Sequence, residues 1–180
     1  MKKFNKDKLW FTSDLHCYHK NICKYCNRPF DSVESMNSAL IKRWNSLIKD
    51  DDDVFMLGDV VFGRYEKWVE IISQLKGNKH LIIGNHDPEN VVNKLCEEGY
   101  FKSVSQMKLI KVEDQELFLC HYPMIEWPNK ERGSLMLHGH VHSTEDTPSF
   151  SEYHYDVGMD HNAWFPVSYV ELKEKIKICE

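Results

Sequence analysis

The chain has 180 residues, of which 42% are hydrophobic and 28% charged, and its formal net charge is −5. This length fits a single domain covering residues 1–180, and the balanced composition excludes a disordered chain. No apolar run approaches the roughly 20 residues that a membrane span needs, and the first residues lack the pattern of a signal peptide. We therefore expect a cytoplasmic protein without membrane association, and the acidic balance disfavours binding to long nucleic acids.

Short apolar runs and helical stripes alternate through the first half of the chain. Residues 9–13, 54–57 and 81–83 have the pattern of buried strands. Helical periodicity covers residues 36–48, 68–75 and 88–98; Asp31 and Glu34 are expected to cap the first stripe, and Gly77 and Gly99 to follow the others. This order predicts right-handed crossovers and a parallel sheet.

The second half is richer in strand patterns. Residues 108–112 and 117–120 flank a polar turn and predict a hairpin. Residues 135–137, 153–157 and 167–172 are expected to form further strands with little helix between them. The whole pattern predicts an α/β fold in which two sheets pack face to face with helices outside.

Metal-seeking side chains follow nearly every predicted strand in the chain. They form five clusters, Asp14-Leu15-His16, Gly58-Asp59, Gly84-Asn85-His86-Asp87, His121 and Gly139-His140-Val141-His142. Carboxylates, imidazoles and amide oxygens bind divalent transition metals. Because sites in open α/β sheets gather beyond the carboxyl ends of strands, we expect these side chains to meet at one sheet edge. One such cluster could be an ordinary surface group, but five together predict a binuclear metal site.

In this order the clusters resemble the signature of the calcineurin-like metallophosphoesterase superfamily, from Asp14 to His142. Residues 13–16, 19–22 and 28–30 resemble a subgroup of small stand-alone bacterial and phage phosphoesterases, although Cys17-Tyr18 stands where that subgroup often has Phe-Gly. The resemblance implies a four-layer αββα sandwich of two mixed sheets. It also implies one metal held by Asp14, His16 and His142, a second held by Asn85, His121 and His140, and Asp59 as the bridge between them.

The resemblance further implies that His86 is an imidazole near the metals that binds the phosphoryl group or protonates the leaving group, with Asp87 orienting its ring. Two cations lower the pKa of a bridging water, so that hydroxide attacks phosphorus without a covalent enzyme intermediate. Manganese is the expected metal, and iron, zinc, nickel and cobalt are alternatives because the donor set selects none of them sharply.

Substrate contacts outside the metal shell are predicted at His19 and Arg28, since a guanidinium matches phosphate oxygens. The alternative for Arg28 is an ion pair with a carboxylate on the following helix. We expect a phosphodiesterase for nucleotide-type or other small phosphoesters, because no large cap is available to enclose a monoester. A nuclease for single-stranded nucleic acid and a metal-bound, non-catalytic scaffold remain alternatives, and the oligomeric state is left open.

Six cysteines in a chain without an export signal are expected to be reduced thiols. Cys23 and Cys26 have the spacing of a redox or zinc motif. A four-cysteine zinc site would need a second such pair, which the sequence lacks.

Overall fold

The computed structural model describes residues 3–144 and 146–176, which form two β-sheets and several helices. The first sheet has the strand order β4-β3-β2-β1-β9, in which β9 is antiparallel to β1 and the other pairs are parallel. Its strands are β1 (Leu9–Thr12), β2 (Asp53–Met56), β3 (Asn78–Ile82), β4 (Ser103–Ser105) and β9 (Val167–Ser168).

The second sheet has the order β5-β6-β7-β8, with an antiparallel β5-β6 hairpin followed by parallel pairs. Its strands are β5 (Met107–Val112), β6 (Gln115–Cys120), β7 (Leu135–His138) and β8 (His154–Asp156). The helices are α1 (Ile22–Tyr25), α2 (Val33–Leu47), α3 (Tyr65–Ile72), α4 (Glu89–Glu97), α5 (Tyr169–Lys175) and the 3-10 turns Lys6–Lys8 and Lys130–Arg132.

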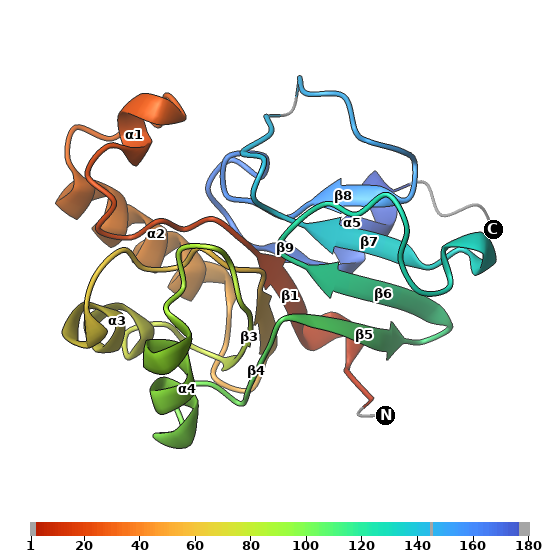
Figure 1. Ribbon diagram of the computed structural model, residues 1–180, viewed down its shortest axis with the longest axis horizontal. Coiled ribbons are helices and arrows are strands. Elements are labelled where there is room, and N and C mark those ends of the chain that lie inside the picture. The colour runs from red at the N-terminus through yellow and green to blue at the C-terminus, as the bar shows by residue number, and fades with distance from the viewer. Residues whose placement is uncertain (1–2, 145, 177–180) are drawn as a thin grey trace.

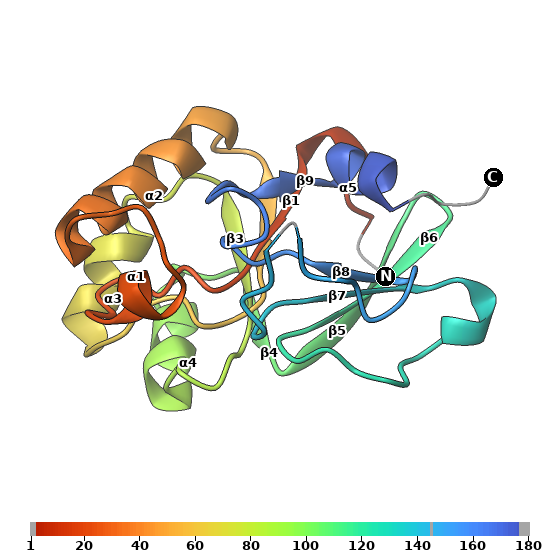
Figure 2. The same cartoon turned by 90° about the horizontal axis from the view of Figure 1, so that it is seen from above.

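Alternating side chains of the first sheet serve two hydrophobic cores. In β2, Val54 and Met56 face helices α2, α3 and α4, where Trp44 and Trp68 are fully buried. Phe55 points to the other face and packs with the second sheet. Figures 1 and 2 show the result: these helices cover one face of the first sheet, and the second sheet lies against the other. The expected α/β sandwich of two mixed sheets flanked by helices is confirmed.

The predicted strand over residues 167–172 is wrong beyond Ser168. The chain turns there into α5, because Ser168 accepts a hydrogen bond from the backbone of Glu171 and the Glu171 side chain accepts one from the backbone of Ser168. Tyr169 and Leu172 are buried in the core between the sheets. Tyr169 and Leu172 are three residues apart, so they lie on one face of the helix and are both buried there. The same hydrophobic residues had suggested a strand in the sequence.

The start of α2 also differs from the expectation. Ser32 and Ser35 form the reciprocal cap, whereas Asp31 and Glu34 were predicted. Helix α3 covers residues 65–72 rather than 68–75, and α4 lies close to its predicted range. These shifts of a few residues leave the order of strands and helices unchanged.

None of the helices in the described ranges combines the length and apolar character needed to span a membrane. The described cysteines, which are Cys17, Cys23, Cys26, Cys96 and Cys120, carry free thiols.

Candidate metal centre

The five predicted clusters meet where the carboxyl ends of strands from both sheets come together. The Asp14 backbone N–H donates to the Gly58 carbonyl (3.0 Å), which joins the segments after β1 and β2. The Gly139 N–H donates to the His121 carbonyl (3.0 Å), which joins the segments after β7 and β6. The two sheets are linked in turn, because the Asp14 carboxylate accepts from the His140 N–H (2.9 Å). The sheet edge predicted from the sequence is thus a continuous hydrogen-bonded rim.

Many residues of this rim have an unusual backbone conformation. Five of the seven predicted metal ligands have a positive φ: Asp14 (57°), His16 (51°), Asp59 (54°), His140 (71°) and His142 (48°). The left-handed region costs a non-glycine residue roughly 1–3 kcal/mol, and such residues concentrate at functional sites. The strained backbone therefore directs the side chains of these predicted ligands toward the site and lowers local stability in return.

Asp14, His16 and His142 form the first of two groups that could hold a metal ion. One donor atom from each lies within 4.8 Å of the others. Asp14 Oδ1 and His16 Nε2 are buried and have no hydrogen-bond partner among the described residues. Buried polar atoms without partners are costly, and a cation between them would remove that cost.

The second group contains Asp59, His121 and His140, whose donor atoms are equally close together. Asn85 joins it, because its Oδ1 lies 3.0 Å from His121 Nε2. The other ring nitrogen of His121 lies 2.7 Å from the Leu57 carbonyl. Donation of the Nδ1 proton to that carbonyl leaves the Nε2 lone pair directed at this group, which is the arrangement a metal-binding histidine needs.

Asp59 lies between the two groups. Its Oδ2 is 3.5 Å from His16 Nε2 in the first group and 3.6 Å from His121 Nε2 in the second. Its Oδ1 accepts a hydrogen bond from the His86 backbone N–H (2.9 Å), which fixes the orientation of the carboxylate. The position is that of a residue able to bridge two cations.

The charge states of Asp14, His16 and His140 suit cation binding. Burial disfavours the charged form of Asp14, but the neighbouring imidazoles of His16, His142 and His121 outweigh this effect and hold its pKa at about 2. Burial lowers the pKa of His16 and of His140. Asp14 is therefore an anion and these two imidazoles are neutral at physiological pH, as metal ligands must be. Burial acts in the same direction on His142, but its hydrogen bond with Asp160 and other neighbouring groups outweigh it and raise its pKa to about 10, so this imidazole must release a proton when it binds a metal.

His86 lies beside the first group. Its ring centroid is 5.6 Å from that of His16 and 6.3 Å from that of His19. His19 is itself 5.4 Å from His16 by the same measure. The structure thus brings together both histidines that the sequence analysis placed near the metals but outside the ligand set.

Asp87 was expected to orient the His86 ring, but the hydrogen bonds of its carboxylate within the described residues go to backbone groups. Its buried carboxylate accepts hydrogen bonds from the backbone N–H groups of Asp59 (2.9 Å), Val60 (3.0 Å) and Gly84 (2.8 Å). Burial is the larger influence on its pKa, which rises to about 6 despite these bonds. Asp87 therefore ties together the segments that follow β2 and β3, and it acts on the backbone of the site.

The Arg28 side chain is buried in contacts with other protein groups, so its predicted contact with substrate stays a prediction that this geometry does not support. Its fully buried side chain donates from Nε and Nη2 to the two carboxylate oxygens of Asp160, each at 2.8 Å. It also donates to the backbone carbonyls of Leu15 (2.9 Å) and Asp14 (2.7 Å). The alternative of an ion pair was right in kind, but the partner is Asp160 rather than a carboxylate of α2.

Asp160 is the residue that the sequence analysis missed. Besides binding Arg28, its Oδ2 lies 2.7 Å from Nδ1 of His142, a predicted metal ligand. Asp160 belongs to none of the five clusters, and it is 18 residues from His142 and 132 from Arg28. No local motif could have indicated this contact.

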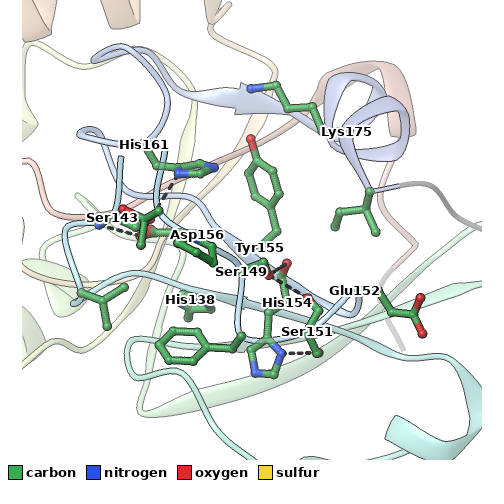
Figure 3. Close-up of a pocket in the computed structure, with 15 residues that line it drawn as sticks. His138, Ser143, Ser149, Ser151, Glu152, His154, Tyr155, Asp156, His161 and Lys175 are labelled. Carbon is green, nitrogen blue, oxygen red and sulfur yellow. Dashed lines mark hydrogen bonds between the residues drawn. The ribbon is translucent and has the colours of Figure 1, made fainter. Parts of the chain in front are cut away.

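A cavity of about 600 Å³ lies next to the His140–His142 loop but outside the metal centre (Figure 3). Its lining includes His138, Ser143, Phe150, Tyr155 and Asp156, and none of the seven predicted metal ligands. Many of its polar groups are already paired; the Ser143 hydroxyl, for example, donates to Asp156 (2.5 Å). The cavity is thus separate from the cluster of metal-seeking side chains.

Comparison with known proteins agrees with this geometry. The family model of calcineurin-like phosphoesterases matches residues 7–173. The chain therefore belongs to the calcineurin-like phosphoesterase family, and it is a metal-dependent phosphoesterase.

Two similar proteins and one solved structure were compared with this chain. An uncharacterized protein of Methanocaldococcus jannaschii, MJ1445, is 35% identical over 138 residues, or 76% of this chain and 70% of its own. A probable cyclic nucleotide phosphodiesterase of Coxiella burnetii is 29% identical over 100 residues, or 53% of this chain and 38% of its own. The crystal structure of a protein of unknown function from Aquifex aeolicus, AQ665, shares the fold: TM-score 0.76, 24% identity, 93% of this chain and 98% of that one.

Proposed function

We propose that this protein is a binuclear phosphodiesterase that hydrolyses nucleotide-type or other small phosphoesters. The observation that carries the proposal is the position of Asp59 Oδ2, 3.5 Å from His16 Nε2 and 3.6 Å from His121 Nε2. A carboxylate oxygen between two sets of donors is suited to two cations at once. The unpaired buried atoms of Asp14 and His16 support occupancy of the first position.

In this proposal Asp14, His16 and His142 hold one divalent cation, Asn85, His121 and His140 hold the other, and Asp59 contacts both. Manganese is the leading candidate, and iron, zinc, nickel and cobalt suit the same donors. When bound, two such ions activate a water nucleophile and neutralise charge on the phosphoryl oxygens.

His86 has the second role. Its ring lies beside His16, and its backbone is fixed by Asp59. We propose that this imidazole donates a proton to the leaving oxygen, while His19, on the same side, contacts the substrate. The preference for a diester is supported by the Coxiella burnetii relative, whose name is that of a cyclic nucleotide phosphodiesterase.

The test is a hydrolysis panel with the manganese-loaded protein. Its members are p-nitrophenyl phosphate, bis(p-nitrophenyl) phosphate, a cyclic nucleotide, a dinucleoside polyphosphate and a single-stranded oligonucleotide. We expect the diesters to be hydrolysed faster than the monoester. Asp59→Asn should abolish turnover and lower the bound metal from two ions per chain, whereas Asp114→Asn, at a fully exposed site in the β5-β6 turn, should change neither.

Each other outcome points elsewhere. Strong preference for the monoester would overturn the diester assignment. Preference for the oligonucleotide would make the protein a nuclease. Two bound metals with no activity on any member would indicate a non-catalytic scaffold, and one bound ion per chain would contradict the binuclear site.

A further inference from the structure

We propose that Asp160 is a positioning residue for the first metal position and that Arg28 holds Asp160 in place. Asp160 Oδ2 lies 2.7 Å from His142 Nδ1, while the other ring nitrogen of His142 is 3.9 Å from Asp14 Oδ1. A proton kept on Nδ1 by the carboxylate leaves Nε2 as the lone pair that faces Asp14. Such carboxylate–histidine pairs fix both the tautomer and the direction of a metal-binding ring.

Arg28 makes the arrangement rigid. Its guanidinium forms a two-pronged hydrogen bond with Asp160, and both side chains are almost completely buried, at 0% and 4% exposure. The same guanidinium binds the carbonyls of Asp14 and Leu15, so Asp160 is anchored to the segment that carries two ligands of the first group. Planar, charge-assisted pairs of this kind are strong and directional.

Cys26 gives the cluster a second interpretation, which the charges disfavour. One donor atom each from Cys26, His142 and Asp160 lies within 4.8 Å of the others, a grouping that could itself hold a cation. However, both carboxylate oxygens of Asp160 already accept from Arg28, whose positive charge would repel an ion placed there. The structure therefore favours a role for Asp160 in positioning His142 over a third metal position at these residues.

The test compares metal binding by metal-free proteins that carry Asp160→Asn, Arg28→Lys or Asp53→Asn. Asp53 pairs with His80 (3.1 Å) at the opposite end of β2 and is the matched carboxylate–histidine control. In a calorimetric titration with manganese, one of the two metal positions of Asp160→Asn should bind about 10- to 100-fold more weakly than in the wild type, or should not fill at all. Arg28→Lys, which keeps the Asp160–His142 bond, should lose less, and Asp53→Asn should match the wild type.

Circular dichroism of the metal-free proteins separates this result from a loss of folding. If Asp160→Asn does not fold, the titration of Arg28→Lys decides alone. A loss of manganese affinity in that variant supports the proposal, and an unchanged affinity overturns it. Unchanged affinity at both positions in folded Asp160→Asn would overturn the proposal, as would equal weakening by Asp53→Asn. A third equivalent of manganese bound by the wild type and lost in Cys26→Ser would support the competing metal site instead.

Exposed aromatic rings beside the metal centre carry a second inference, which rests on the proposed function. Phe62 is 44% exposed, and its ring centroid lies 4.7 Å from that of His19 and 5.7 Å from that of His86. Tyr122 is also 44% exposed and lies 4.6 Å from the His140 ring. One exposed ring therefore lies against His19 and His86, the two histidines beside the first group of predicted ligands, and the other lies against His140 of the second group. We infer that the substrate is a phosphodiester with a flat ring system on at least one side, such as a nucleoside.

The chemistry of a diester fits this placement, since phosphorus carries two organic groups that leave the metal centre in different directions. Aromatic faces stack nucleobases of any sequence and contribute strongly to their binding. Tyr25, which is 70% exposed and 6.1 Å from the His19 ring, extends the Phe62 side.

The experiment measures kcat/KM for two diesters that share a leaving group, thymidine 5′-(p-nitrophenyl phosphate) and methyl p-nitrophenyl phosphate. The proteins are the manganese-loaded wild type, Phe62→Ala, Tyr122→Ala and the control Phe150→Ala, which removes an exposed ring packed on His138 and His154 instead. We expect Phe62→Ala or Tyr122→Ala to lower the rate for the nucleoside ester by about 5- to 150-fold relative to the methyl ester.

Failure of this inference can be told from failure of the proposed function. If the wild type hydrolyses both esters but the ratio of rates is the same in all four proteins, the ring inference is wrong and the diesterase stands. If the wild type hydrolyses neither ester with metal bound, the proposed function itself is wrong.

Discussion

The carboxylate of Asp59 links the metal groups to the residue proposed as the acid. Oδ2 is shared between His16 and His121, and Oδ1 accepts from the backbone of His86. His86 thus depends on Asp59 for its position, although its ring belongs to neither group of ligands. Metal binding and acid catalysis should therefore be separable by single substitutions.

His86→Ala should lower kcat by about 10²- to 10⁴-fold, the usual contribution of general acid catalysis. The protein should still bind its metals, because the contact with Asp59 uses the His86 backbone. Steady-state kinetics with elemental analysis of the same sample measures both. Loss of metal in His86→Ala would show that its ring is a ligand.

Asp87→Ala should destabilise the metal-free protein by at least about 2 kcal/mol, since three buried backbone N–H groups lose their acceptor. Urea unfolding measures the effect. The exposed control Asp114→Ala should stay within about 0.5 kcal/mol of the wild type. If the two variants were equally stable, the bonds of Asp87 would not support the fold.

At the scale of strands and loops, the site depends on the close approach of segments that follow different strands. A side chain at Gly84 would collide with Asp59, and one at Gly139 would collide with Ser13 and Asp14. These glycines lack a β-carbon at the points where the backbone passes close to a ligand-bearing segment, which explains why they precede the histidines in their clusters. Gly139 in this way lets the segment after β7 pass close to the segment after β1, which belongs to the other sheet.

Gly139→Ala should therefore weaken metal binding by pushing the His140–His142 loop away from Asp14. Gly133→Ala is the matched control, because nothing lies within 4 Å of its added methyl group, although its φ of +83° imposes a backbone cost. Titration with manganese should show weaker binding only in Gly139→Ala. Normal affinity there would mean that the loop adjusts without moving its ligands.

At the scale of the whole molecule, the metal centre connects the two sheets. The first group takes Asp14 and His16 from the segment after β1 and His142 from the segment after β7. The second combines Asp59, which follows β2, with His121, which follows β6. Bound cations should therefore stabilise the packing of one sheet against the other.

Manganese at about 100 times its Kd should raise the melting temperature by roughly 5–10 °C for each occupied position, from about 2.7 kcal/mol of linkage per site. Differential scanning calorimetry with and without a chelator checks this shift. Asp59→Asn should show a smaller shift than the wild type. A melting temperature that does not respond to metal would contradict occupancy of the folded state.

The sequence by itself determined the class of fold, the order of most strands and helices, and the family. Buried strands and helical stripes are local patterns, so their periodicity can be recognised in the amino-acid sequence alone. The metal-seeking residues were recognisable because each cluster begins within a few residues of the end of a strand, and parallel strands bring their carboxyl ends to one edge. The end of β9 was harder, since residues 167–172 suit both a strand and a helix until the Ser168 cap forms.

Only the tertiary structure decided which polar partners meet. Arg28 reaches Asp160 across 132 residues, and Asp87 binds backbone groups of Asp59 and Val60 in another segment. Such pairings depend on how strands are ordered and how loops cross, and hydrogen-bonding side chains carry no local sign of their distant partner. For this reason the residue types needed for phosphoester chemistry could be predicted from the sequence, while the contacts that hold them in place could not.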